Sequence, residues 1–143
     1  MTLDNLLAER QIYRNLVHFA QAMDNRDWPA FDKLTIDNID ADLGLGLKAG
    51  RGEMVGTIRR YLDGCGVTQH LLGNVLIDVD GDKASSQAYV CDMHLGKGDN
   101  QQMTFHTLGL YTDQWQKIDG QWLMTQRIKD NRATVGSMDV FNG

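Results

Sequence analysis

Two short segments hold the residues best suited to chemistry. The first is DNRDW, Asp24–Trp28, which follows an apolar helical face, and the second is TQHLLGN, Thr68–Asn74, which opens a strand. A carboxylate at the end of an apolar face is costly to bury unless a neighbour hydrogen-bonds it, and histidine is the partner suited to proton transfer near neutral pH. We therefore expect Asp24 and His70 to meet in a small enclosed pocket.

A second histidine is expected beside this pair. The turn sequence DGDK predicts an antiparallel hairpin whose register places Met93 or His94 opposite His70, to within a residue or two. Two histidines and an aspartate would allow general acid–base catalysis, because neutral imidazole accepts a proton and imidazolium returns it. The structural alternative is that Asp24 caps the bend after the helix and that both histidines are ordinary polar residues of strands.

Metal binding is a third interpretation of the same residues. His70, His94 and Asp24 could act as ligands, with His106 nearby. The sequence contains no HxH or HExxH spacing at these positions, so we expect no metal site and no cofactor.

Ligand contacts are expected on later strands and on the first helix. Side chains alternate across a strand, which turns one set inward: Phe105, Thr107, Gly109 and Tyr111. They would form an apolar wall with two hydroxyls, and Gly109 would leave room for a ligand. Arg127 could meet a ligand carbonyl or carboxylate, and Tyr13 is predicted to contact the ligand as well. Ordinary sheet packing, and a surface ion pair for Arg127, are the alternatives.

The elements that must position these residues are helices followed by strands. Helical spacing predicts helices over residues 3–24, from Trp28 to Leu34, and over 52–62. A first strand is expected over 36–47, and four more, separated by turn sequences, over 67–79, 84–96, 101–117 and 121–132. Three helices followed by an antiparallel meander indicate an α+β fold in which a curved sheet wraps round the helices, as one domain of 143 residues.

The strand over 67–79 also suggests an interface. Strict alternation puts His70, Leu72, Asn74 and Leu76 on one face and Leu71, Val75, Ile77 and Val79 on the other. The second face is apolar enough to suit the helices or a subunit contact, so we expect a homodimer or homotrimer.

Composition excludes several classes of partner. The chain has 14 Lys and Arg against 19 Asp and Glu, a net charge of -5, which does not favour nucleic acid. It has no apolar run long enough for a membrane span. Two cysteines, Cys65 and Cys91, form no disulfide framework, which fits a reducing compartment. We expect a soluble, cytoplasmic protein that binds a small molecule.

These segments together resemble the SnoaL-like group of the NTF2-like superfamily, which includes scytalone dehydratase and hexachlorocyclohexane dehydrochlorinase. The resemblance covers the first helix, the bend AMDNRDW, the strand TQHLLGN and the segment QKIDGQWLM. It implies an NTF2-like cone, in which three N-terminal helices pack in a curved mixed, mainly antiparallel sheet. It also implies catalytic roles for Asp24, His70 and His94. The chain departs from scytalone dehydratase where that enzyme has a substrate-binding tyrosine, serine and asparagine, since these positions are Met23, Gly109 and Tyr111 here.

The resulting hypothesis is a cofactor-independent lyase or isomerase, dehydratase-like, acting on a small, mostly apolar cyclic or polyketide-like substrate. His70 would remove a proton, Asp24 would orient His70 and stabilise its charged form, and His94 would donate a proton to the departing oxygen or enolate. The alternative is a non-catalytic ligand-binding domain, or a partner subunit of related fold such as the β subunit of ring-hydroxylating dioxygenases.

Overall fold

Two α-helices and a 3₁₀ helix form the first half of the chain in the computed structural model, which describes residues 1–143. Helix α1 runs over Leu3–Asp24, and its first turn is capped by the Thr2 hydroxyl, which accepts a hydrogen bond from the Asn5 backbone N–H at 3.1 Å. A 3₁₀ helix, Trp28–Lys33, follows with a proline in its first turn, and α2 spans Arg51–Leu62. These three helices match the predicted ones closely.

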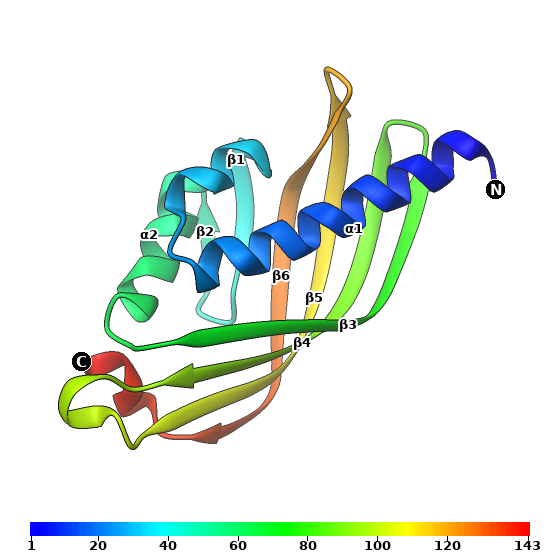
Figure 1. The fold of residues 1–143 in the computed structure, drawn as a ribbon. Coiled ribbons are helices and arrows are strands. Elements are labelled where there is room, and N and C mark those ends of the chain that lie inside the picture. The colour runs from blue at the N-terminus through cyan, green and yellow to red at the C-terminus, as the bar shows by residue number, and fades with distance from the viewer.

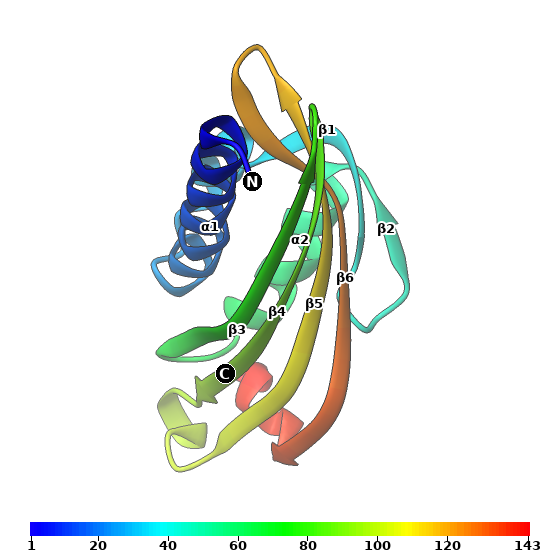
Figure 2. The ribbon, with the colours of Figure 1, turned by 90° about the vertical axis from the view of Figure 1, so that its right-hand side faces the viewer.

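One six-stranded sheet makes up most of the rest, in the order β2-β1-β6-β5-β4-β3. Its strands are β1 (Thr35–Asp42), β2 (Leu47–Ala49), β3 (Thr68–Asp80), β4 (Lys83–Leu95), β5 (Thr104–Ile118) and β6 (Gln121–Gly136). All neighbours pair antiparallel except β1 and β6, which are parallel. The sheet is therefore mixed and mainly antiparallel, as predicted, while the single strand expected over 36–47 ends at Asp42 and is followed by a separate short strand, β2. The sheet is strongly curved, and α1 lies across it (Figure 1 and Figure 2).

The side chains between helices and sheet form one core. Helix α1 contributes every third or fourth residue, including Ile12, Leu16 and Phe19, each no more than 1% exposed. The sheet contributes Trp115 and Trp122 to the same cluster. Because α1 and the curved sheet share this core, the C-terminal end of α1 is fixed against the beginning of β3 (Figure 1).

A β-bulge in β3 overturns the predicted division of that strand into two faces. The pairing with β4 shifts between Gly73 and Leu76, and Asn74 has φ 51°. Beyond the bulge the alternation changes sides: Val75, Ile77 and Val79 pack against the core, while Leu71 and Leu76 are 61% and 66% exposed. The prediction that Leu71 shares a face with the three later residues was therefore wrong, because strict alternation cannot anticipate a bulge.

The last residues fold back onto the molecule. A 3₁₀ helix, Met138–Asn142, follows β6 and buries Val140 completely. The ring of Phe141 packs edge-on against Tyr61 of α2 and His94 of β4, with centroids 5.3 and 5.0 Å apart. This segment thereby covers one end of the space enclosed by the sheet (Figure 2). No helix of the structure has the combination of length and apolar character needed to cross a membrane.

Candidate active site

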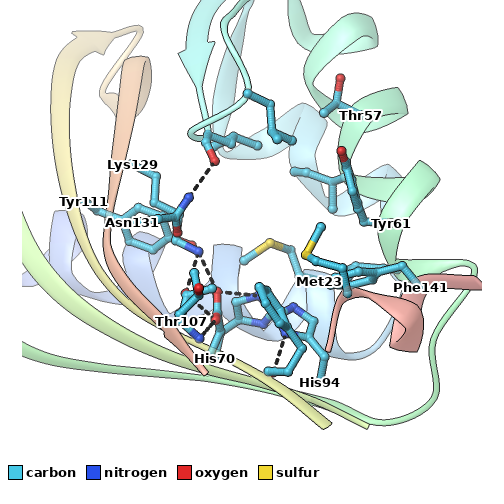
Figure 3. Close-up of a pocket in the computed structure, with 18 of the residues that line it drawn as sticks. Met23, Thr57, Tyr61, His70, His94, Thr107, Tyr111, Lys129, Asn131 and Phe141 are labelled. Atoms are coloured by element: carbon cyan, nitrogen blue, oxygen red, sulfur yellow. Dashed lines mark hydrogen bonds and ion pairs between the residues drawn. The ribbon is translucent and has the colours of Figure 1, made fainter. Parts of the chain in front are cut away.

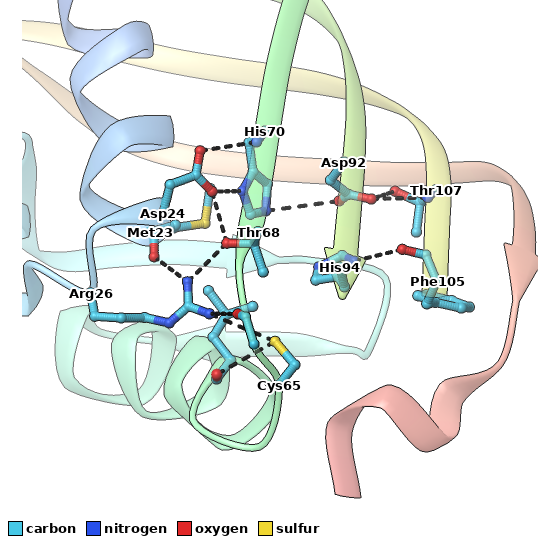
Figure 4. Close-up of polar contacts among 12 residues, drawn as sticks. Met23, Asp24, Arg26, Cys65, Thr68, His70, Asp92, His94, Phe105 and Thr107 are labelled. Atoms are coloured by element: carbon cyan, nitrogen blue, oxygen red, sulfur yellow. Dashed lines mark hydrogen bonds and ion pairs between the residues drawn. The ribbon is translucent and has the colours of Figure 1, made fainter. Parts of the chain in front are cut away.

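The carboxylate of Asp24 holds the ring and the backbone of His70. Asp24 is the last residue of α1, and its Oδ1 lies 2.7 Å from His70 Nδ1, while its Oδ2 accepts the His70 backbone N–H at 3.0 Å. The Thr68 hydroxyl donates a third bond to Oδ1 at 2.9 Å. The predicted contact between Asp24 and His70 is thus present, across the junction of α1 and β3 (Figure 4).

An arginine supports this arrangement from the bend after α1. Arg26 adopts the left-handed conformation, φ 55°, and its guanidinium donates to the Met23 carbonyl at 2.8 Å and to the Gly66 carbonyl at 2.7 Å. It also donates to the Thr68 hydroxyl oxygen at 2.8 Å. Since this hydroxyl in turn donates to Asp24, Arg26 ties the bend and the start of β3 to the carboxylate (Figure 4). Residue type and spacing alone do not identify Arg26 as part of the site.

The hydrogen bonds to Asp24 define its charge and the tautomer of His70. Partial burial opposes ionisation of Asp24, but the bonds from the His70 ring, the His70 backbone and Thr68 outweigh it, and its pKa lies below the ordinary value. A carboxylate accepts only, so His70 Nδ1 carries the hydrogen in this contact. The other ring nitrogen, Nε2, then has a free lone pair. The His70 side chain is 5% exposed and lines the main cavity, so this lone pair is available to a bound molecule.

Opposite His70 lies Asp92, which sequence reasoning missed. The predicted register placed Met93 or His94 there, but the bulge in β3 shifts the pairing so that His70 faces Asp92. Its Oδ2 lies 4.0 Å from His70 Nε2 and 2.6 Å from Lys129 Nζ. Thr107 donates to its Oδ1 through both the backbone N–H, at 2.9 Å, and the hydroxyl. Burial opposes ionisation of Asp92, yet Lys129 and Thr107 together hold its pKa below the ordinary value.

His94 lies in the same cavity and is held by a backbone carbonyl. Its Nδ1 is 3.0 Å from the Phe105 carbonyl oxygen, which can only accept, so the hydrogen is on Nδ1 and Nε2 is an acceptor. Burial lowers the pKa of His94, and the nearby charge of Asp92 opposes that effect without reversing it. One ring nitrogen of each histidine and an Asp92 oxygen lie within 4.8 Å of one another. One water or one substrate atom can therefore contact both imidazoles.

The residues that meet here close one end of a cavity of about 250 Å³. Its polar end is formed by His70, His94, Asp92, Thr107 and Lys129 (Figure 3). The remaining wall is mostly apolar and includes Met23, Ile58, Tyr61, Leu62, Met138 and Phe141. A largely apolar cavity with a few convergent polar groups is typical of a small-molecule site.

The predicted ligand contacts are only partly in this cavity. Phe105, Thr107 and Tyr111 line it, on the inward face of β5 as expected. Tyr13 does not, because it follows buried Ile12 by one position, which turns it about 100° away from the buried stripe of α1, and it is 44% exposed beside β3.

Arg127 is also absent from the cavity, because it lies two residues before Lys129 on the same face of β6, opposite Asp113, where it is buried in the core. It pairs with Asp113 through bonds of 2.8 and 2.9 Å, and its guanidinium lies 3.6 Å from the centre of the Tyr111 ring. This buried pair supports the back of the cavity wall at Tyr111.

Gly109 serves a different purpose from the predicted one. A Cβ atom there would lie 2.9 Å from Lys129 Cε and 2.9 Å from Val90 Cγ1. The missing side chain therefore makes room for the stem of Lys129 and not directly for a ligand.

A curved mixed sheet that wraps round helices, with a cavity between them, is the NTF2-like fold. The chain belongs to the SnoaL-like domain family, whose model matches residues 4–128. An uncharacterised protein of Mycobacterium tuberculosis is 29% identical to it over 121 residues, 83% of this chain and 82% of that protein.

Solved structures show the same fold. A proposed aromatic ring hydroxylase from Novosphingobium aromaticivorans superposes with a TM-score of 0.80 at 25% identity, covering 91% of this chain and 93% of that one. A proposed scytalone dehydratase from the same organism gives 0.85 at 22%, covering 96% and 92%. A hexachlorocyclohexane dehydrochlorinase from Novosphingobium barchaimii gives 0.83 at 16%, covering 94% and 93%.

Proposed function

We propose that this protein is a cofactor-independent lyase or isomerase that removes a proton from carbon in a small, mostly apolar cyclic substrate. The observation that carries the proposal is the 2.7 Å contact between Asp24 and His70 Nδ1, which leaves His70 Nε2 as a free acceptor at the cavity. Family members of this fold include a dehydrochlorinase and a proposed dehydratase, which fits elimination chemistry.

His70 is the general base in this mechanism. Its Nε2 takes a proton from a carbon beside a carbonyl, and the C–H electron pair moves into the new double bond. The imidazolium that forms has the Asp24 carboxylate at Nδ1 and the Asp92 carboxylate 4.0 Å from Nε2, so both negative charges favour the charged ring. In a dehydration, the same proton passes from Nε2 to the departing hydroxyl as water forms. In an isomerisation it returns to a different carbon.

The role of His94 changes from the predicted one. A proton donor must carry a hydrogen on the atom facing the substrate, but His94 Nδ1–H is bound to the Phe105 carbonyl and its lowered pKa keeps the ring neutral near pH 7. Its Nε2 then accepts a hydrogen bond from a substrate hydroxyl and positions it. His70, which receives a proton in the first step, is the better donor for the second.

The test is proton exchange and dehydration with simple cyclic ketones. Cyclohexanone in D₂O reports α-proton exchange by ¹H NMR, and 3-hydroxycyclohexanone reports dehydration by the ultraviolet absorbance of the enone. We expect turnover that falls about 10²–10⁴-fold in Asp24→Asn and His70→Gln. The matched control is His106→Gln, because His106 is a strand histidine outside the cavity.

Ligand binding without chemistry is the competing outcome. If cyclic ketones bind in the cavity but neither exchanges nor dehydrates above the rate of the double variant Asp24→Asn/His70→Gln, the enzyme proposal is refuted. The protein would then be a binding domain of the same fold.

A further inference from the structure

Lys129 is the one cationic side chain that lines the cavity. It projects from the middle of β6, opposite Tyr111 in the register with β5, and its side chain is only 10% exposed. Two partners hold its ammonium: Asp92 Oδ2 at 2.6 Å and the Thr107 hydroxyl oxygen at 3.0 Å. A lysine so enclosed is fixed in position, unlike a lysine on the surface.

The ammonium has one more hydrogen than these partners use. It has three N–H groups, and the two bonds to Asp92 and Thr107 leave the third without a protein acceptor. Because Lys129 lines the cavity, this free donor is available to a bound molecule (Figure 3). Asp92 cannot be displaced easily, since Thr107 fixes its other oxygen through two further bonds.

The free donor lies at the same end of the cavity as the base. His70 Nε2 and Lys129 Nζ approach the same Asp92 oxygen, at 4.0 and 2.6 Å. The two nitrogens are therefore within the span of one small functional group. A carbonyl compound can place an α C–H at His70 and its oxygen at Lys129.

We propose that Lys129 is the oxyanion-binding residue of this site, and hence that its substrates are carbonyl compounds that react through an enolate. This inference rests on the proposed function. When His70 Nε2 takes the α proton, the C–H electron pair forms a carbon–carbon double bond and the carbonyl π pair moves to oxygen. Lys129 donates a hydrogen bond to that oxygen and keeps its proton. The enolate then collapses, expels hydroxide from the β carbon, and the hydroxide leaves as water with the proton from His70.

The same geometry argues against a cation at this place. His70, His94 and Asp92 have donor atoms close enough for a metal ion, within 4.8 Å of one another. However, the Asp92 oxygen that faces His70 is the one already bound to the Lys129 ammonium. A metal would have to displace Lys129 or sit beside its positive charge, whereas a developing oxyanion is attracted by it.

The test uses 4-nitrophenol, whose phenolate is a stable model of an enolate and absorbs visible light. We expect the protein to bind 4-nitrophenolate more tightly than the phenol, and so to lower the apparent pKa of the bound dye. Lys129→Met should weaken phenolate binding about ten- to hundredfold, because a charge-assisted hydrogen bond is lost. Binding of 4-nitroanisole, which has the same shape and no charge, should stay within about twofold.

Two further variants keep the test decisive. Lys129→Met leaves buried Asp92 without its cation, so the double variant Lys129→Met/Asp92→Asn removes both charges together and protects the fold. Lys83→Met, at the exposed first residue of β4, controls for the loss of one positive charge. The inference is overturned if the double variant binds phenolate as tightly as the unaltered protein, or if the unaltered protein binds only the neutral dye.

Failure of the Lys129 proposal can be distinguished from failure of the proposed function. Asp24→Asn disables the base but leaves Lys129 in place, so it should retain phenolate binding. If the unaltered protein binds phenolate but catalyses no ketone exchange, the enzyme proposal is refuted and the oxyanion-binding role of Lys129 still holds. Ketone exchange that survives in Lys129→Met/Asp92→Asn at the full rate would refute the oxyanion role and leave the base.

Discussion

Replacing Asp24 with asparagine should separate activity from stability. The carboxylate accepts three hydrogen bonds, from His70 Nδ1–H, the His70 backbone N–H and the Thr68 hydroxyl. Asparagine has one acceptor oxygen and one donor NH₂ group in nearly the same shape. The effect of the substitution on His70 depends on which of these two groups faces its ring.

The backbone determines the orientation of the new amide. The His70 backbone N–H can only donate, so the amide oxygen must face it, at the position of Oδ2. The NH₂ group then faces the imidazole and the Thr68 hydroxyl, and both can adapt: the ring by moving its hydrogen to Nε2, the hydroxyl by rotating. His70 would then present an N–H to the cavity and would no longer be a base.

The expected magnitudes follow from this exchange. Proton abstraction should fall about 10²–10⁴-fold, as for the loss of a general base or its correct tautomer. The free energy of unfolding should fall by only about 1–2 kcal/mol, because the His70 ring and backbone keep a partner, and the losses are the bond donated by the Thr68 hydroxyl and the charge on the acceptor.

The measurement combines ketone exchange in D₂O, urea denaturation and ¹⁵N NMR of the histidine rings. The unaltered protein should show the hydrogen of His70 on Nδ1, and Asp24→Asn should show it on Nε2. Full activity in Asp24→Asn, or a His70 ring with its hydrogen on Nε2 before the substitution, would refute the reasoning.

Four other substitutions have expected outcomes. Burial lowers the pKa of His94, so below about pH 6.5 the native state binds fewer protons than the unfolded chain. The melting temperature should therefore fall as the pH is lowered below about 6.5. The fall should be less steep in His94→Gln, which has no imidazole at this position. The lowered pKa of Asp92 adds a second loss of stability below about pH 4, which Asp92→Asn should abolish in the same melting series. Arg26→Met removes three hydrogen bonds from a charged group and should cost about 2–3 kcal/mol in urea denaturation; an unchanged midpoint would show that Arg26 does not support the site. Gly109→Ala puts a Cβ against the Lys129 stem and should weaken 4-nitrophenolate binding more than 4-nitroanisole binding; equal weakening would mean general distortion.

Periodicity predicted the elements of this fold well. The α1 stripe repeats without interruption from Ala8 to Met23, and each hairpin of the meander has its own turn sequence, so bounds agree to within a few residues. The contact between Asp24 and His70 was also predictable. The two residue types suit each other, Asp24 lies at the end of a helix, and His70 lies at the start of a strand.

The rest of the site depended on features that alternation does not encode. The bulge after Gly73 put Asp92, and not its neighbours, opposite His70. A bulge in β6 between Met124 and Gln126 sets which residues of the rest of the strand face inward, and Arg127 and Lys129 share that face, with Arg127 in the core and Lys129 at the cavity. A single inserted residue in a strand reverses every later side chain, so the cation of the site could be identified only once the register was known.

The bond between Asp24 and the His70 backbone also affects the open edge of the sheet. Strand β3 is the last in the sheet, and an edge strand with free N–H groups is a template on which another chain can add a strand. At His70 that N–H is already taken by a carboxylate that lies alongside the edge, and a charge there repels an incoming backbone carbonyl. The carboxylate that orients the base therefore also hinders another strand from pairing with the edge of β3. Loss of Asp24 should make the protein more prone to aggregate.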